Sequence, residues 1–226
     1  MKPQNILVLD TCERRVRVAL VTDGAISHES RGTDAATMLP EALLTVLDEA
    51  HLPVSALDLV VATRGPGSFT GIKIGLSVLW GFTRPAGVRA IGVDRLHALA
   101  ESVDPGLVEP IVVAVPAWAG MLYSAVYRHP PGSSPGEPRE RAGSYLLGHP
   151  DEMMSGLPDR GTLLHLSPGD DPLSRHAGFT PVTFDPDAYL RAMARLAVRS
   201  SKNPDWKATT PLFLRMTEKR SGRAHV

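Results

Sequence analysis

Arg64-Gly65-Pro66-Gly67-Ser68-Phe69-Thr70-Gly71-Ile72-Lys73-Ile74-Gly75 follows an apolar strand predicted over 58–63 and leads into an apolar segment with helical spacing over 71–83. Backbone amides often bind anions at such a strand-to-helix turn. A Walker loop needs four residues between its glycines, but Gly65 and Gly71 enclose five. The dinucleotide fingerprint needs two residues between its second and third glycines, but Gly67 and Gly71 enclose three. Both phosphate-binding motifs are therefore excluded.

A structural interpretation of the same stretch needs no ligand. Gly65-Pro66-Gly67 forms a tight turn, Ser68 or Thr70 caps the helix, and Gly71 and Gly75 lie four apart on one helix face. Each glycine inside a helix costs about 1 kcal/mol relative to alanine, so both need a reason. Close approach of a second helix or strand is the favoured reason, and contact with a ligand is the alternative.

The chain around this stretch alternates strands and helices. Predicted strands cover 6–10, 16–20 and 25–31, with a turn at Asp23-Gly24, and a helix follows over 35–51. A strand over 91–93 and a helix over 94–103 complete the first half. Asp104-Pro105-Gly106 then marks a boundary.

The second half repeats the rhythm without sharing sequence. Strands are predicted over 111–115, 121–127 and 161–166, a mobile loop over 129–141 and a frayed tail over 216–226. A helix beginning at 185–187 has one apolar side, and its other side carries an arginine stripe that we interpret as solvated: Arg191, Arg195 and Arg199. The simplest architecture is α/β, with mixed sheets flanked by helices in two similar lobes, 1–103 and 104–226.

Composition restricts the function. The 226 residues are 43% hydrophobic and carry 24 basic against 24 acidic side chains, so a folded core is expected and direct RNA binding is disfavoured. The only cysteine, Cys12, excludes a disulfide framework, and the first apolar run is too short for a signal peptide, so we expect a cytoplasmic protein. The closest two histidines are eleven residues apart, which leaves no helical metal pair. We expect no catalytic residue, metal or cofactor.

Two features could still carry function. Asp10 ends the first strand, where the ligand crevice of such a sheet opens, although hydrogen bonding within the hairpin is its commoner use. The helix over 35–51 has an apolar arc wider than half its circumference, formed by Leu39, Leu43, Val46, Leu47 and Ala50 and widened by Met38, Ala42 and Leu44. One sheet cannot cover that arc, so the helix is either sandwiched inside the fold or faces another protein.

Several motifs together resemble the bacterial TsaB (YeaZ) family: the Ile6–Thr11 start, Met38-Leu39-Pro40, the glycine-rich stretch 65–75, Ile91-Gly92-Val93 and the run 96–100. Fainter similarity continues over 120–127 and 211–215. The resemblance implies two ribonuclease-H-like lobes of the actin, Hsp70 and sugar-kinase superfamily. It also implies a non-catalytic scaffold in making threonylcarbamoyladenosine at position 37 of tRNA. In that family the N-terminal lobe pairs with the metal-binding catalytic relative TsaD, and the pair recruits the ATPase TsaE. Catalytic relatives of the M22 glycoprotease-like type carry a His-x-x-x-His pair, which this chain lacks.

The sequence departs from the family pattern at Cys12, at Ala36-Thr37 and at Pro116-Ala117-Trp118. The rival hypothesis is an independent small-molecule kinase or ATPase of the same fold, using Asp10 and the turn at 65–70 on phosphate. Such kinases need several glycine-rich phosphate loops and an acidic residue in the second lobe, and 116–118 offers neither. A metal-dependent peptidase is the weakest alternative, for want of ligands.

The resemblance and the two anomalies lead to specific site expectations. We expect Met38, Ala42, Leu44 and Thr45 to line a seam with the TsaD-like partner, and Gly71 and Gly75 to let the helices of the two lobes approach. Replacing Gly75 by leucine should then weaken assembly and leave the lobe folded. The same surface should form a homodimer in isolation, and tRNA should bind only through the complex. Weak contact with a nucleotide or anion is expected at Asp10, Thr11, Gly67 and Ser68.

Overall fold

The computed structural model describes residues 4–32, 35–133, 136–167, 169–200, 211–212, 215–216 and 224–225. The chain forms two compact units, one of Met1–Arg95 with Leu190–Leu212, the other of Leu96–Tyr189 with Phe213–Val226. The chain therefore returns to the first unit after residue 189. We predicted two consecutive domains, 1–103 and 104–226, and whether each of these segments folds on its own stays a prediction.

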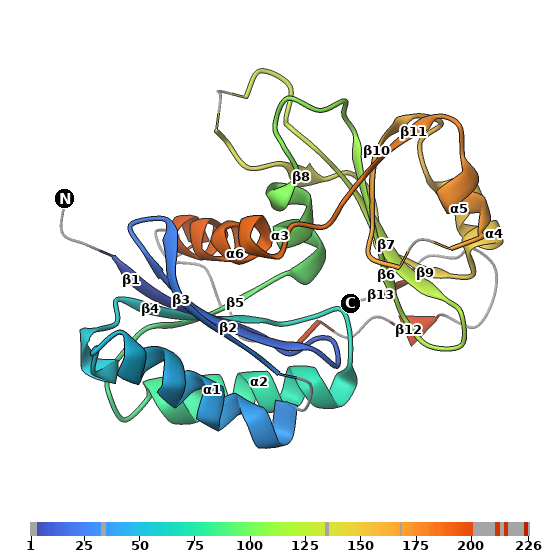
Figure 1. Ribbon diagram of the computed structural model, residues 1–226. Helices are drawn as coiled ribbons and strands as arrows, with labels where there is room; N and C mark the ends of the chain where they lie inside the picture. The colour runs from blue at the N-terminus through green and yellow to red at the C-terminus, as the bar shows by residue number, and fades with distance from the viewer. Residues whose placement is uncertain are drawn as a thin grey trace. The chain divides into compact units, whose positions relative to one another are not determined.

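The first unit is built on a mixed five-stranded sheet in the order β3-β2-β1-β4-β5. Its strands are β1 (Asn5–Asp10), β2 (Val16–Thr22), β3 (Ala25–Gly32), β4 (Leu59–Thr63) and β5 (Ala90–Val93). β1 pairs with β2 antiparallel and with β4 parallel. Nearly every residue of β1, β2 and β4 is buried, because helices cover both faces of the sheet (Figure 1).

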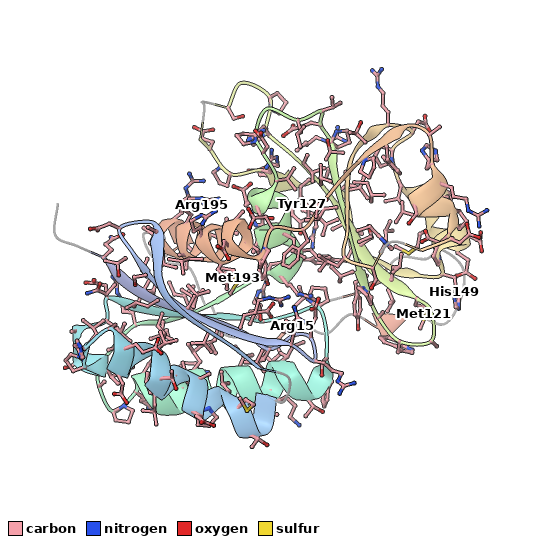
Figure 2. The ribbon with its side chains drawn as sticks, in the orientation of Figure 1. Arg15, Met121, Tyr127, His149, Met193 and Arg195 are labelled. Atoms are coloured by element: carbon pink, nitrogen blue, oxygen red, sulfur yellow. The ribbon has the colours of Figure 1, made fainter. Side chains whose placement is uncertain are left out.

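Helices α1 (Ala35–Glu49) and α2 (Phe69–Thr83) lie side by side on one face of this sheet, and α6 (Pro186–Ser200) lies on the other (Figure 1). A short 3₁₀ turn, η1 (Val54–Ala56), precedes β4. On α6 the apolar side predicted from the sequence faces inward: Met193 is fully buried, while Arg195 projects from the opposite side (Figure 2). The position of α6 places the arginine stripe beside the first sheet.

The second unit contains a mixed sheet in the order β11-β10-β6-β7-β8, with β9 also paired to β7. Its strands are β6 (Ile111–Pro116), β7 (Leu122–Arg128), β8 (Glu140–Arg141), β9 (Leu146–Gly148), β10 (Gly161–His165) and β11 (Phe179–Val182). The helical elements are α3 (Arg95–Ser102, whose first residue belongs to the first unit), α4 (Pro150–Met153), η2 (Met154–Gly156) and α5 (Pro172–Arg175). Two mixed sheets with flanking helices confirm the predicted α/β class.

Two expectations for the second half, a mobile loop and a frayed tail, concern motion and stay predictions. The loop over 129–141 contains a buried anchor: Arg139 is 2% exposed, and its Nη1 donates to the carbonyl oxygen of Ala100 at 2.9 Å. Its Nε also donates to Glu109 Oε1 at 3.0 Å, and the loop ends in β8. The tail expected to fray contains two short paired strands, β12 (Arg215–Met216) and β13 (Ala224–His225). Residues 217–223 and 226 of that tail lie outside the described residues.

Candidate functional site

Asp10 lies at the carboxyl end of β1, as the sequence predicts, but its side chain is fully buried. Its Oδ1 accepts hydrogen bonds from the Cys12 backbone N–H at 2.9 Å and from the Thr63 hydroxyl at 2.7 Å. Thr63 ends β4, the parallel neighbour of β1, so the two strand ends bring the residues together. The carboxylate therefore joins the two strands internally.

Two buried arginines balance this carboxylate. Arg17 Nη1 lies 3.8 Å from Asp10 Oδ2 and 3.7 Å from Glu13 Oε2, and Arg95 forms an ion pair with Glu13. Burial opposes ionisation of Asp10, but the charge of Arg95, the hydrogen bonds from Cys12 and Thr63 and the charge of Arg17 together outweigh it. The pKa of Asp10 is thus lowered, and the group is an anion at neutral pH.

Cys12 is buried beside this cluster, with its Sγ 3.1 Å from the Thr63 hydroxyl oxygen. Burial and the neighbouring Asp10 charge raise the pKa of the Cys12 thiol. The thiol therefore stays protonated at neutral pH.

The loop after β1 packs directly against the start of α2. The Thr11 hydroxyl donates to the carbonyl oxygen of Gly71 at 2.8 Å. A Cβ atom on Gly71 would overlap the Thr11 carbonyl oxygen, and one on Gly75 would overlap the Thr11 hydroxyl. The close approach that these glycines permit is therefore to Thr11 in the same unit, and not, as expected, to a second protein.

Ser68 caps α2, which settles the choice between the two predicted caps. Its Oγ accepts from the Gly71 N–H at 3.1 Å, and its own N–H donates to the Cys12 carbonyl oxygen at 2.8 Å. Gly65 makes the preceding turn with φ of 112°, where a side chain would also overlap the Leu212 carbonyl oxygen. The internal bonds of Asp10, Thr11 and Ser68 account for these residues without a ligand. Nucleotide or anion contact at Asp10, Thr11, Gly67 and Ser68 stays a prediction.

The outer surfaces of α1 and α2 present large apolar side chains. Leu44 of α1 is 57% exposed, and on α2 Phe69 is 55% and Trp80 47% exposed. Thr45 is exposed beside Leu44, and Lys73 places its ammonium 4.8 Å from the centroid of the Phe69 ring. We call these five residues the α1–α2 face. Exposed apolar side chains of this size are typical of interaction surfaces.

The expected seam residues divide between this face and the interior. Leu44 and Thr45 are exposed, and Met38 is half-buried. Ala42, Gly71 and Gly75 are buried within the unit, because α1 packs on β2 and β3 and α2 packs on the Thr11 loop. Helix α1 is thus not sandwiched, since Leu44 lies on its outer side.

Several residues of the site could not be found from the sequence. Thr63, Glu13 and Arg95 have no motif, and their partners lie tens of residues away along the chain or across a turn. Phe69 and Trp80 could have been identified from the sequence. They are large apolar residues outside the buried stripe of an amphipathic helix, where they do not pack in the core of the unit. Among the described residues, no cluster of three His, Cys, Asp or Glu side chains is placed to hold a metal ion. In the same part of the chain, no helix has the length and apolar character that a membrane span requires.

Comparison with known proteins finds similarity to proteins described as TsaD and as TsaB. The family described as TsaD, tRNA N6-adenosine threonylcarbamoyltransferase, matches residues 33–134. The chain is 30% identical over 142 residues to the tRNA threonylcarbamoyladenosine biosynthesis protein TsaB of Haemophilus influenzae, covering 61% of this chain and 60% of that protein. It is 29% identical over 129 residues to TsaB of Escherichia coli, covering 54% of each. The matched region thus spans between half and two thirds of these curated relatives.

The fold has a counterpart among solved structures. YeaZ from Pseudomonas aeruginosa superposes with a TM-score of 0.72 at 23% identity, over 93% of this chain and 100% of that one. At this identity the likeness concerns the fold alone.

Proposed function

We propose, because this chain belongs to the TsaB (YeaZ) family, that it takes part in the biosynthesis of threonylcarbamoyladenosine in tRNA as a non-catalytic subunit. It pairs with a TsaD-like catalytic protein, and the pair recruits a TsaE-like ATPase and contacts tRNA. On its own the chain forms a homodimer through the same surface, in a cytoplasmic setting.

The observation that carries this proposal is the α1–α2 face. Three large apolar side chains stand exposed on α1 and α2, within the residues 33–134 that match the TsaD description, and burying them against a partner removes an unfavourable contact with water. Trp80 is the residue type most often found to dominate binding energy at interfaces. We assign the partner seam to Leu44, Thr45, Phe69 and Trp80, with Met38 at its margin.

The state of Asp10 supports a non-catalytic role over the rival kinase. A kinase of this fold would use that carboxylate on a metal-bound phosphate, whereas here it is fully buried and engaged with Cys12, Thr63 and Arg17. The turn at Pro116-Ala117-Trp118 also offers no acidic group in the second unit.

Co-purification with the TsaD-like protein of the native host tests the pairing. Trp80→Ala should weaken the pair by about 2 kcal/mol, roughly thirtyfold in Kd, because it truncates a central apolar anchor. Trp118→Ala is the matched control, since Trp118 is 50% exposed on the second unit. The chain should capture the TsaD-like protein, and only Trp80→Ala should reduce capture. No capture by the unaltered chain, or equal effects of the two substitutions, contradicts the proposal.

A further inference from the structure

The arginine stripe of α6 borders a groove in the first unit. The groove holds about 270 Å³ and is lined by Gln4, Ile6, Val21, Gly24, Arg191, Ala194, Arg195, Val198 and Arg199. The floor is apolar, from β1, β2 and α6, and the three guanidinium groups come from successive turns of α6. Their spacing of four residues places all three on one side of α6, and that side borders the groove.

The charge of the groove contrasts with the rest of the protein. None of the described residues that line it is acidic, whereas the chain as a whole is neutral. Two carboxylates lie near the groove along the chain: Asp23 precedes Gly24 and accepts a hydrogen bond from the Gln4 N–H at 3.1 Å, and Asp187 lies one turn of α6 before Arg191. The described lining of the groove therefore contains three basic side chains and no acidic one, which favours an anionic ligand.

The spacing and the volume indicate which anion. Residues four apart on a helix follow one another about 6 Å along its axis, so the arginines present a row of charges instead of one converging cage. The groove holds about 270 Å³, near the lower end of the range of about 300–1,000 Å³ for pockets that enclose small molecules. A ligand with several phosphates in a row, lying across the groove, fits better than an enclosed nucleotide.

We propose that Arg191, Arg195 and Arg199 form a binding groove for the phosphate backbone of RNA. Guanidinium groups bind phosphates through paired hydrogen bonds, and a row of them follows a strand without reading its sequence. The inference rests on the proposed function, in which tRNA is the substrate of the complex. Within the first unit the groove lies on the α6 side of the sheet and the α1–α2 face on the other, so a partner on that face leaves the groove open (Figure 1).

The test measures binding of a labelled unmodified tRNA transcript to the complex of this chain with its TsaD-like partner. The groove variant combines Arg191→Gln, Arg195→Gln and Arg199→Gln. A charge-matched control combines Arg89→Gln, Arg128→Gln and Arg160→Gln, three exposed arginines outside the groove. In low salt the groove variant should lose affinity by about tenfold or more, and its slope of log K against log salt should fall by about 2 to 3. The control should change affinity by less than about threefold.

Equal effects of the two triple variants, or an unchanged groove variant, overturn the inference while the proposed function stands. Labelled ATP is titrated in parallel, because a nucleotide carries the same phosphate chemistry. Loss of ATP binding with retained tRNA affinity also overturns the RNA assignment. If the unaltered chain does not assemble with its partner, the proposed function fails. The two triple variants are then compared for tRNA binding as isolated chains in low salt, with circular dichroism to verify that they are folded.

Discussion

A methyl group cannot be accommodated at Gly71, because the carbonyl oxygen of Thr11 occupies the position that its carbon would take. Gly71→Ala should therefore destabilise the protein by about 2 kcal/mol or more, since backbone must shift to relieve the overlap. Gly81, in the same helix, has open space within 4 Å of the position that a Cβ atom would take, so Gly81→Ala should stabilise by roughly 0.5–1 kcal/mol. Urea unfolding of the two variants measures both effects.

The same geometry reverses the expectation for Gly75. A leucine there would overlap the Thr11 hydroxyl and should unfold the isolated unit instead of weakening assembly alone. If the Gly71→Ala variant proved as stable as the unaltered protein, the Thr11 loop would be able to move away from the added methyl group. Contact with a partner would then be the favoured reason for these glycines.

Asp10 links stability to pH. Folding lowers the pKa of Asp10 from an unfolded value near 3.8. The Asp10 charge therefore adds to the free energy of unfolding above that pH, and this contribution is lost as the pH falls through the folded pKa. Asp10→Asn keeps an acceptor for Cys12 and Thr63 but removes the charge that faces Arg17. The free energy of unfolding of this variant should be lower than that of the unaltered protein by about 3 kcal/mol at pH 7, and by less as the pH falls below about 4.

Unfolding by urea at a series of pH values measures this difference. Asp48→Asn on the outside of α1 is the control, and it should change stability by less than about 0.5 kcal/mol at every pH. If the free energies of unfolding of Asp10→Asn and the unaltered protein differed by the same amount down to pH 3, the lost stability would come from packing and not from charge.

At the scale of elements, the N-terminus of α2 offers a direct comparison. Ser68→Ala removes the acceptor for the Gly71 N–H and should cost about 1 kcal/mol, whereas Thr70 is exposed inside the first turn and Thr70→Ala should be nearly neutral. Thermal unfolding of both variants decides between the two caps. A larger loss from Thr70→Ala would place the start of α2 two residues later.

The longer elements of the first unit could be predicted because their periodicity is clear over many residues, as in α1, α2, β1 and β4. The errors lie at boundaries: α2 begins at Phe69, before Gly71, and α1 ends at Glu49 because His51 turns the chain with φ of 51°. The missed elements β8, β9, α4 and α5 are two to four residues long, too short to show a period.

The candidate site was predictable only in part. Asp10 could be identified from its place at the end of an apolar strand, and Leu44 from the excess width of the apolar arc of α1. Arg95 could not be identified from the sequence. It follows β5, Glu13 follows β1, and the two side chains meet only because both strands end on the same side of the folded sheet. Long-range pairs of this kind leave no local pattern in a single sequence.

At the scale of the whole molecule, the division of the chain can be tested with fragments. A fragment of residues 1–103 lacks Leu190–Leu212, which belongs to the first unit and includes most of α6, and would expose the sheet face that α6 covers. It should melt without a cooperative transition and bind a hydrophobic dye. A fragment in which 186–212 is joined to 1–103 through a flexible linker should regain a cooperative transition by circular dichroism. Cooperative melting of 1–103 alone would support two consecutive domains.

The return of the chain at Leu190 also sets a schedule for synthesis on the ribosome. The strands of the first sheet are complete at Val93, but the helix that shields their second face emerges about a hundred residues later. At about 5–20 residues per second, the nascent sheet waits roughly 5 to 20 seconds with that apolar face uncovered. During this interval the growing chain is a natural client for chaperones, and codon choices that slow translation between the two segments would lengthen its exposure.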